Sequence, residues 1–276
     1  MIAFLRNRVL TVVFVLGSLG AFEARADLYS CGVDLGAAGR TKQWAVFTLG
    51  DGVDPNVSMS GNSEVRGAIG AAGTGNVTLS GQAKLKGRLY YHTGGKLTLS
   101  GSAGTADGRF QDAATDSLLN QAAIDAQNAS DEAFGLAVTP QYASLTNVNI
   151  SSGHNITITG SGCVVLKLTD FVMTSGTFTL QGTAGTSFII NVSNQFSLSG
   201  SSKIVLGTGI LTQDVLFNVR GTGTVSLSGS AKLDGVLLAT NRSVSILGSA
   251  TVRGEVIANS VNISGSGSVI TPTTNR

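Results

Sequence analysis

The chain is poor in the residues that metal sites, disordered tails and charge-driven binding require. Its 276 residues include 3 prolines, 2 cysteines and 2 histidines, and only 12% of the residues are charged. Because 42% of the residues are hydrophobic, the composition is not that of a disordered chain. The small charged fraction is not typical of a protein whose binding depends on a strong net charge. Glycine, in contrast, is abundant, with 37 residues. Small residues and many turns favour a stacked β fold.

The N-terminal segment has the pattern of a secretory signal. Two arginines precede an apolar run over residues 9–22, and the segment ends with Ala24 and Ala26 in an A-x-A cleavage pattern. The apolar run is short for a helix that spans a bilayer. We therefore predict a signal peptide at residues 1–26 and a single mature domain at residues 27–276.

The balance of charge argues against a nucleic-acid partner. The precursor has a formal net charge of +2, and removal of the signal peptide leaves equal numbers of basic and acidic residues. No basic arm or basic patch with interleaved aromatic residues follows the signal. No second hydrophobic span follows either. The sequence therefore predicts a secreted, extracellular protein that is released or held at the cell surface by non-covalent contacts.

Two cysteines, Cys31 and Cys163, remain in the mature chain. In an oxidising compartment an even pair of cysteines more often forms a disulfide than stays reduced. Such a bond would join the N-terminal segment to the middle of the chain. Two unpaired small residues are the alternative, which only the distance between the cysteines can exclude.

A short phrase that alternates apolar and hydroxyl residues and ends in glycine occurs in nine copies. Strict alternation predicts a short strand with one buried face and one solvated face. The final glycine allows a turn where a side chain would clash. Most copies are separated by about one coil of a β-solenoid. The copies are VSMSG ending at Gly61, VTLSG at Gly81, LTLSG at Gly101, ITITG at Gly160, FTLQG at Gly182, FSLSG at Gly200, VSLSG at Gly229, VSILG at Gly248 and VNISG at Gly265.

The repeat is interrupted once, by a segment rich in alanine. Leu119, Ala122 and Ala126 begin a stripe of small residues with three- and four-residue steps, which is typical of an amphipathic helix. We predict a helix over residues 109–134. Because a stripe of alanines permits close approach to another backbone, we expect this helix to lie along the outside of the stack. A linker helix between two domains is less consistent with the repeat that resumes afterwards.

The order of these parts resembles the bacterial ice-binding-protein-like superfamily. The second half of the chain, with FIINVSNQFSLSGSSKIVL and VSILGSATVRGEVIA, is similar to the ice-binding domain itself, whereas the early SEVRGAIGAAGTGNVTLSG is more similar to the choice-of-anchor A domain of bacterial surface proteins. The resemblance implies a discontinuous right-handed β-solenoid with an α-helix packed alongside, in an all-β class with one long helix. The early coils lack the proline-containing turn of the ice-binding domain, and, in contrast to the anchored family, we expect no C-terminal anchor.

Residues for catalysis are few and scattered. Neither histidine, His92 or His154, lies in a zinc-binding pattern, and no serine lies in a nucleophile-elbow motif. The best carboxylates, Asp170, Asp214 and Asp234, fall in different coils, whereas an acid–base pair would need neighbouring ones. Asp51 and Asp54 are more typical of a turn than of a calcium site. We therefore expect no enzymatic activity, no metal site and no cofactor.

Six copies of the phrase carry a hydroxyl at both outward positions. If they stack in register, hydroxyls repeat about every 4.8 Å between strands and about every 7 Å along each strand. Such a lattice can order water or contact another ordered surface, although serine and threonine are also ordinary residues of an exposed strand. The array predicted to bind a surface is Ser58, Ser60, Thr78, Ser80, Thr98, Ser100, Thr157, Thr159, Ser197, Ser199, Ser226 and Ser228.

From the sequence we favour adhesion to a cell-surface or matrix polymer over binding to ice. Serine outnumbers threonine in the array, so few methyl groups are available for the partly apolar contact that favours ice over liquid water. An adhesive surface would instead use loops and charged residues. Its charged residues would be Glu64, Lys84, Lys203 and Lys232, each three residues after a glycine of the repeat.

Overall fold

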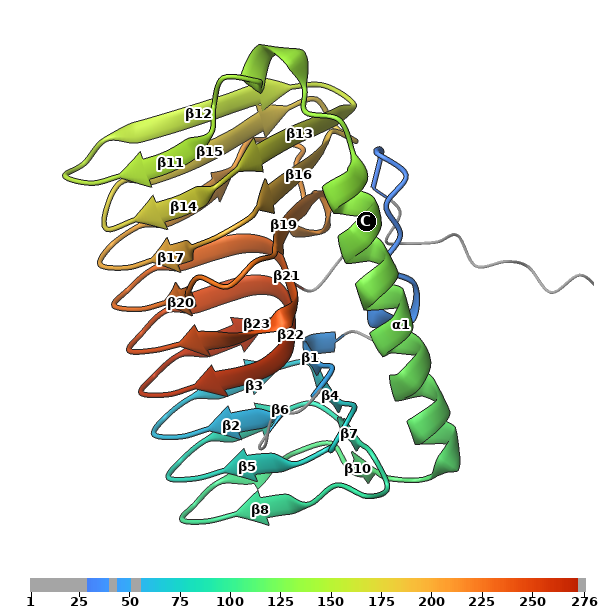
Figure 1. Cartoon of the computed structure of the whole chain (residues 1–276). Coiled ribbons are helices and arrows are strands. Elements are labelled where there is room, and N and C mark those ends of the chain that lie inside the picture. The colour runs from blue at the N-terminus through green and yellow to red at the C-terminus, as the bar shows by residue number, and fades with distance from the viewer. Residues whose placement is uncertain (1–28, 40–43, 51–55, 273–276) are drawn as a thin grey trace, which may run out of the picture.

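The computed structural model describes residues 29–39, 44–50 and 56–272 and shows a β-solenoid with one long helix alongside it (Figure 1). The predicted fold class is confirmed. All strand pairs are parallel, as expected for coils stacked along one axis. The predicted signal peptide and the turn that contains Asp51 and Asp54 lie outside the described residues.

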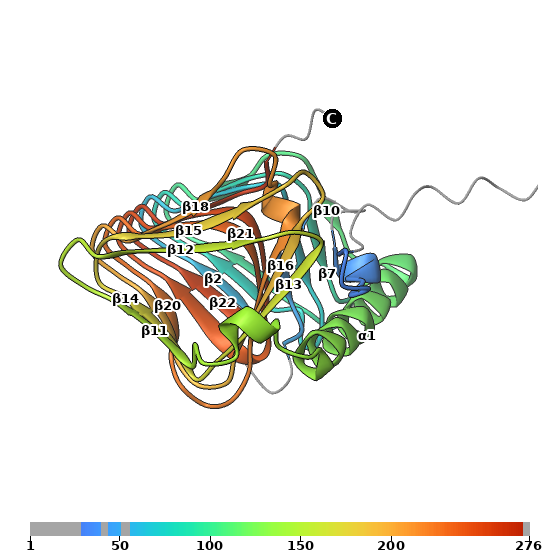
Figure 2. The same cartoon turned by 90° about the horizontal axis from the view of Figure 1, so that it is seen from above.

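Each coil contributes strands to three parallel columns, which form the sides of a roughly triangular section (Figure 2). The β2 column consists of β11 (Asn147–Ile150), β14 (Asp170–Met173), β17 (Phe196–Leu198), β20 (Val225–Leu227), the last residues of β21 (Lys232–Ile246) and β22 (Thr251–Ile263), β2 (Val57–Met59), β5 (Val77–Leu79) and β8 (Leu97–Leu99).

The β3 column consists of β12 (Asn155–Gly160), β15 (Thr177–Gly182), β18 (Lys203–Leu206), the first residues of β21 and β22, β23 (Ser268–Ile270), β3 (Glu64–Arg66), β6 (Lys84–Lys86) and β9 (Gly104–Thr105). The β1 column consists of β13 (Cys163–Leu168), β16 (Ser187–Val192), β19 (Val215–Val219), the middle of β21 and β22, β1 (Trp44–Thr48), β4 (Ala68–Ala71), β7 (Leu89–Tyr91) and β10 (Arg109–Phe110).

The coils do not stack in sequence order. The last strands of the chain, β22 and β23, pair with β1, β2 and β3 from its beginning. The stack therefore runs from β11, β12 and β13 at one end (the β11 end) to β8, β9 and β10 at the other (the β8 end). The C-terminal coil lies in the middle of the stack. Helix α1 (Ala113–Gly135) carries the chain from the β8 end back to the β11 end (Figure 1).

The length of α1 matches the distance between the two ends of the stack. Its 23 residues span about 35 Å at 1.5 Å per residue, which is the height of about seven coil-to-coil steps of 4.8 Å. The helix begins at Ala113, later than the predicted residue 109, because Arg109 and Phe110 form β10. A 3-10 helix at Pro140–Tyr142 (η3) follows at the β11 end, and within the described residues two others lie at Gly36–Ala38 (η1) and Thr212–Asp214 (η4).

Two apolar clusters hold the molecule together, one inside the stack and one between the stack and α1. Inside, phenylalanine rings of successive coils stack, as do Phe171 and Phe196 with centroids 5.2 Å apart. Outside, the small-residue stripe of α1, including Leu119, Ala122 and Ala126, is buried against outward side chains of the β1 column. The predicted packing of the helix is confirmed.

The N-terminal segment is attached to the same side of the stack. Cys31 and Cys163 form a disulfide with their Cα atoms 5.0 Å apart, which confirms the predicted pair. The backbone N–H of Ala37 donates to Asp125 Oδ2 on α1 at 2.7 Å, and Trp44 Nε1 donates to the carbonyl of Ala37 at 2.9 Å. The segment therefore covers part of the helix and the β1 column together.

A buried polar network fixes the position of α1 along the stack. Asn191 and Asn218 occupy the same register position in β16 and β19, and Asn218 Nδ2 donates to Asn191 Oδ1 at 2.8 Å. Asn218 also accepts from Ser130 Oγ at 2.8 Å and donates to the carbonyl of Ser130 at 2.9 Å. Asn191 Nδ2 donates to the carbonyl of Ala133 at 2.7 Å. Alanine packing alone would permit α1 to slide along the stack, whereas these hydrogen bonds specify one position of the helix.

We predict that Asn218→Leu lowers the free energy of unfolding by about 1–3 kcal/mol, because it leaves buried partners on α1 and β16 without hydrogen bonds. Urea denaturation measures the change. The control is Asn262→Leu, at an exposed position of β22, which should stay within about 0.5 kcal/mol of the wild type. Equal losses in the two variants would contradict this role.

Candidate binding surface

The outward positions of the β2 column form two continuous lines of small uncharged side chains, which we call the hydroxyl face. The first line follows the register of the paired strands, and the second follows the residues just after each strand, whose backbone N–H groups donate to the neighbouring coil. The first line is Ser197, Ser226, Ser245, Asn262, Ser58, Thr78 and Thr98, and the second is Ser199, Ser228, Leu247, Ser264, Ser60, Ser80 and Ser100.

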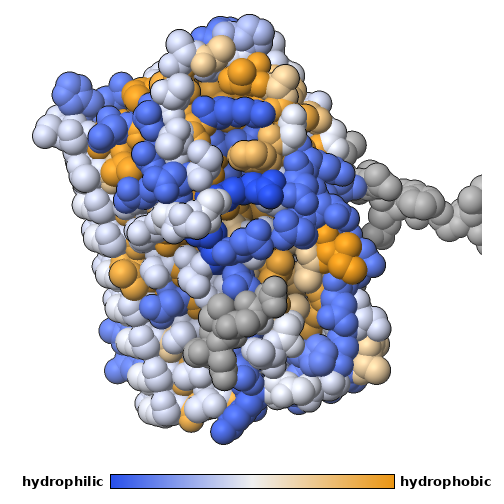
Figure 3. All heavy atoms as spheres, in the orientation of Figure 1, coloured by the Kyte–Doolittle hydropathy of each residue, from blue (hydrophilic) through white to orange (hydrophobic). Residues whose placement is uncertain are grey.

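Alternation of buried and outward residues positions these side chains. In β2, β5, β17 and β20 the first and third residues are buried and the middle one is partly exposed. The apolar residues point into the stack, so the residues between them point outward. In Figure 3, stacked residues of intermediate hydropathy run down the left of the molecule, where the edge of this column lies. The result is a regular surface without long side chains.

The glycine after each copy keeps the lattice in register. Gly61, Gly81 and Gly101 adopt φ between 68° and 70°, and a Cβ on Gly81 would lie 3.1 Å from the backbone N and O of Gly61. Only glycine adopts this conformation easily and leaves room for the next coil. Stacked glycine corners therefore hold the coil spacing at the edge of the hydroxyl face.

Intramolecular hydrogen bonds of the hydroxyl face are long. Ser197 Oγ and Ser226 Oγ are 3.4 Å apart, and Ser80 Oγ donates to the carbonyl of Met59 at 3.4 Å. Ser199 Oγ donates to the carbonyl of Met173 at 3.3 Å. Such bonds are weaker than those near 2.8 Å. These hydroxyls therefore retain capacity to bind water.

Ten of the twelve residues predicted from the sequence belong to the hydroxyl face, but Thr157 and Thr159 do not. They lie on β12, which pairs with β15 in the β3 column. The prediction failed here because strands on any side of a solenoid alternate, so the phrase does not identify the side. The coils at the β11 end instead contribute Asn149 and Val172, which share the register of Ser197.

A longer form of the phrase could have revealed these coils. Met173-Thr174-Ser175-Gly176 and Ile150-Ser151-Ser152-Gly153 insert one serine before the glycine. Ser245, Asn262 and Ser264 were also missed, because their copies carry a hydroxyl at only one of the two positions. The full lattice is therefore longer and more continuous than the sequence suggested.

The outward surface of the β3 column is charged. Lys203, Lys232, Glu64 and Lys84 share one register position along it, as their spacing after the glycines suggested. Long side chains here form ion pairs: Arg253 binds Asp234 through two hydrogen bonds of 2.8 Å. This face is less regular than the hydroxyl face.

Glu64 is paired with two cations of the same face. Lys86 Nζ lies 3.0 Å from Glu64 Oε2, and Arg66 Nε donates to Glu64 Oε1. Partial burial opposes ionisation of Glu64, but the hydrogen bonds from Arg66 and Lys86 outweigh it and lower its pKa. The carboxylate is therefore ionised at neutral pH and compensates nearby lysines.

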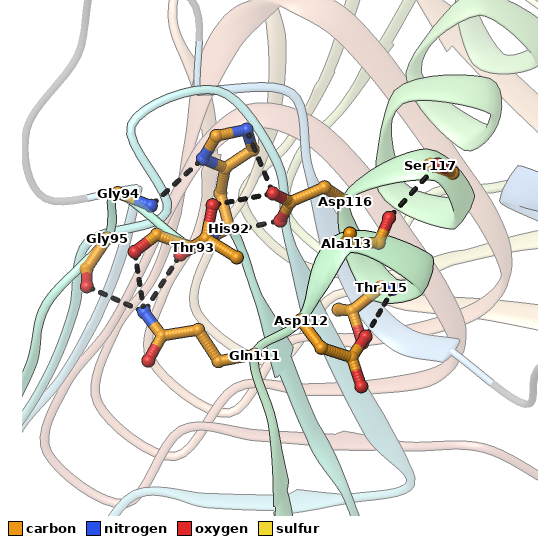
Figure 4. A network of polar contacts seen from close by, with 10 residues as sticks. All are labelled: His92, Thr93, Gly94, Gly95, Gln111, Asp112, Ala113, Thr115, Asp116 and Ser117. Atoms are coloured by element: carbon orange, nitrogen blue, oxygen red, sulfur yellow. Dashed lines mark hydrogen bonds and ion pairs between the residues drawn. The ribbon is translucent and has the colours of Figure 1, made fainter.

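The start of α1 is held by a polar network rather than by a catalytic arrangement (Figure 4). Asp112 caps the helix by accepting from the backbone N–H of Thr115 at 2.7 Å. Asp116 accepts from the backbone N–H and the hydroxyl of Thr93, at 2.9 and 2.6 Å, and lies 3.7 Å from His92 Nε2. His92 Nδ1 accepts from the backbone N–H of Gly94. His92 thus has a structural environment.

The pKa of both aspartates is lowered by these contacts. The backbone N–H of Thr115 is the main cause for Asp112, and the hydroxyl of Thr93 is the main cause for Asp116. Hydrogen bonds that favour the carboxylate lower its pKa. Both groups therefore stabilise the start of the helix in their ionised form.

The three carboxylates considered for catalysis are not brought together. Asp170 accepts from Asn194 Nδ2 at 2.7 Å, Asp214 accepts from the backbone N–H of Leu211 at 2.8 Å, and Asp234 binds Arg253. Within residues 29–39, 44–50 and 56–272, no three His, Cys, Asp or Glu side chains are grouped to hold a metal ion. In the same ranges no helix is both long and apolar enough to cross a bilayer.

The comparisons with known proteins agree with the fold. The profile of a family described as ice-binding-like matches residues 54–271. The chain belongs to the ice-binding-like family. The predicted resemblance to the ice-binding-protein-like superfamily is therefore confirmed. A comparison with curated proteins gave no match.

Solved structures of ice-binding proteins share the architecture of this family member. A glycosylated ice-binding protein from an Arctic yeast is 18% identical, with a TM-score of 0.60 over 88% of this chain and 96% of that one. An ice-binding protein from the Antarctic ascomycete Antarctomyces psychrotrophicus is 18% identical, with a TM-score of 0.54 over 88% of this chain and 99% of that one. At this identity the likeness establishes the fold. The family match overturns the sequence-based preference for an adhesion or matrix role, which was wrong.

We predict that the Asp116 contacts make stability pH-dependent. Because the folded pKa lies below the unfolded value of about 3.9, their contribution is complete above the unfolded pKa and is lost as pH falls through the folded pKa. The melting temperature of Asp116→Asn should therefore fall less steeply than that of wild type below about pH 4. Ser117→Ala, in the first turns of α1, removes a hydrogen bond but no titratable group and is the control, which should keep the wild-type slope. Identical slopes in all three proteins would refute the assignment.

Proposed function

We propose that this protein is a secreted, non-enzymatic ice-binding protein and that the hydroxyl face is the surface that contacts ice. The observation that carries the proposal is the unbroken register from Ser197 to Thr98, which presents small uncharged side chains at fixed intervals. The family supports ice as the partner. The disulfide between Cys31 and Cys163 and the signal-like N-terminus support export to an oxidising compartment.

Regular spacing is what adsorption to a crystal requires. The stack repeats hydroxyls about every 4.8 Å along its axis and about every 7 Å along each strand, which are distances of the same order as those between water molecules in ice. Water bound to such a lattice is already partly ordered, so joining it to a crystal costs less entropy than ordering bulk water. The rigid stack adds little side-chain ordering cost of its own, because serine and threonine are short.

The charged β3 column is less suited to this contact. Lysine and arginine side chains are flexible and strongly hydrated, so a crystal surface would have to displace their water. Lys203, Lys232, Lys84 and Lys86 are all exposed on that side. The β1 column is covered by α1 over much of its height (Figure 1). The hydroxyl face is therefore the best candidate of the three.

The scarcity of threonine in the hydroxyl face determines how strongly we expect the protein to bind ice. Only Thr78 and Thr98 supply methyl groups to the first line of the face, and Leu247 supplies an apolar side chain to the second. Because methyl groups release water on contact, a serine-rich face binds ice less tightly than a threonine-rich one. We therefore expect moderate inhibition of ice recrystallisation.

The test replaces residues in the centre of each face. We predict that Ser226→Tyr, in the hydroxyl face, abolishes ice shaping and recrystallisation inhibition, because a bulky ring prevents flat contact. The matched control is Lys232→Tyr. Lys232 is the first residue of β21 and lies on the β3 column, so this variant should retain full activity. Ser58→Thr, in line with Thr78 and Thr98, should increase activity by adding a methyl group.

Circular dichroism and melting curves establish that each variant is folded, since exposed strand positions tolerate change within about 0.5 kcal/mol. Loss of activity in Lys232→Tyr with retention in Ser226→Tyr would move the ice-binding surface to the charged side. Absence of ice shaping by the unmodified protein would refute the function itself.

A further inference from the structure

The β8 end of the stack is an open sheet edge. Strands β8, β9 and β10 pair with β5, β6 and β7 on one side, and no strand of the described residues lies on their other side (Figure 1). An edge strand leaves half of its backbone N–H and C=O groups without ladder partners. Such an edge can pair with another strand.

At the β11 end, two of the three edge strands are capped by the chain itself. The hydroxyl of Tyr142, in η3, donates to the carbonyl of Thr159 at 2.7 Å and accepts from its N–H at 2.8 Å. Thr139 pairs with Val165 in the same way: its N–H donates to the Val165 carbonyl at 2.9 Å, and its hydroxyl accepts from the Val165 N–H at 2.8 Å. These contacts occupy edge groups of β12 and β13, whose counterparts at the other end of the same columns are β9 and β10.

The β8 edge also lacks the usual protection against pairing. Residues 97–106 contain no charged residue and no proline, although charges and prolines are the common means of preventing edge-to-edge association. One coil further in, the register partner of Gly104 is Lys84, so the edge coil lacks the charge that its neighbour carries. Leu99 and Phe110 are each 37% exposed at this edge. Leu97 and Ala103 pack against the interior apolar cluster but are only partly buried.

We propose that the β8 end is a dimerisation surface on which a second copy of this chain docks through its own β8 end. Antiparallel pairing of β8 with its symmetry mate satisfies backbone groups of both copies. Centred on Thr98, it sets Lys96 opposite Ser100, so no like charges face each other. At the β11 end the edges of β12 and β13 are capped by Tyr142 and Thr139, so a head-to-tail contact would lose pairing that the β8 end offers; the contact is therefore isologous and the assembly stops at two copies.

The dimer would double the length of the hydroxyl face. A two-fold axis between antiparallel neighbours stands perpendicular to their common sheet, so outward side chains of both copies lie on the same side. Thr98 of each copy would then adjoin the other at the centre of one continuous surface. The docking itself follows from the open edge and does not depend on ice binding.

Sedimentation equilibrium of the full mature chain tests the proposal, with Gly104→Lys as the main variant. A Cβ on Gly104 meets no atom within 4 Å and its φ is not positive, so the lysine fits the fold and restores the charge that the neighbouring coil carries. We expect a dimer for the wild type and a dimer dissociation constant raised about tenfold or more for Gly104→Lys, because the added charge would be desolvated in the interface without a partner. Leu99→Lys should act in the same direction.

Val205→Lys is the matched control, since Val205 is 39% exposed on β18, far from the β8 end. It should dimerise like the wild type. A monomeric wild type, an unchanged dissociation constant in both edge variants, or an open assembly larger than a dimer would overturn the proposal. Ice shaping is measured separately: a monomeric Gly104→Lys that still shapes ice leaves the proposed function intact, whereas a dimer without ice shaping removes only that function.

Discussion

The constraint on which the structure depends is the stacking of parallel coils in register. A single coil cannot bury its apolar residues or pair its backbone groups, so each coil is stable only between neighbours. The glycine corners make this stacking possible, because a Cβ on Gly229 would lie 3.0 Å from the backbone N of Gly200. Hydrogen bonds along the axis and phenylalanine packing inside then follow from the same register.

The out-of-order stack explains why one helix is needed. Since β22 and β23 lie between the N-terminal coils and the rest of the stack, the chain must return over the height of the molecule after β10. Helix α1 makes this connection and covers the apolar outer surface of the β1 column. The buried pair Asn191 and Asn218 then fixes its position, which alanine contacts alone would not do.

The three sides of the solenoid consequently differ in what they can do. The β1 column is largely apolar on both surfaces and binds α1, and the β3 column carries paired charges. Among the residues that the structure describes, nothing covers the hydroxyl face, and its two lines carry no charged side chains. Its regularity is a by-product of stacking, because the same register that pairs Ser58 with Thr78 also buries Val57 and Val77. Selection of small polar residues at the outward positions is enough to make a lattice.

Much of the fold could be predicted from the sequence, because alternation and terminal glycine are local signals. The helix and the disulfide also followed from local pattern and composition. The stacking order could not be predicted, since nothing local shows that Val261 pairs with Val57 across the length of the chain. For the same reason Thr157 was assigned to the wrong side. The preference for adhesion gave too much weight to the scarcity of methyl groups and too little to the continuity of the lattice.

The central claim is that this regular face binds crystalline water, and the most direct measurement is the distribution of the labelled, unmodified protein during slow growth of a single ice crystal. The account predicts that the protein accumulates on the ice and is incorporated as the crystal grows. Exclusion of the folded protein into the remaining liquid, as for an ordinary solute, would contradict it.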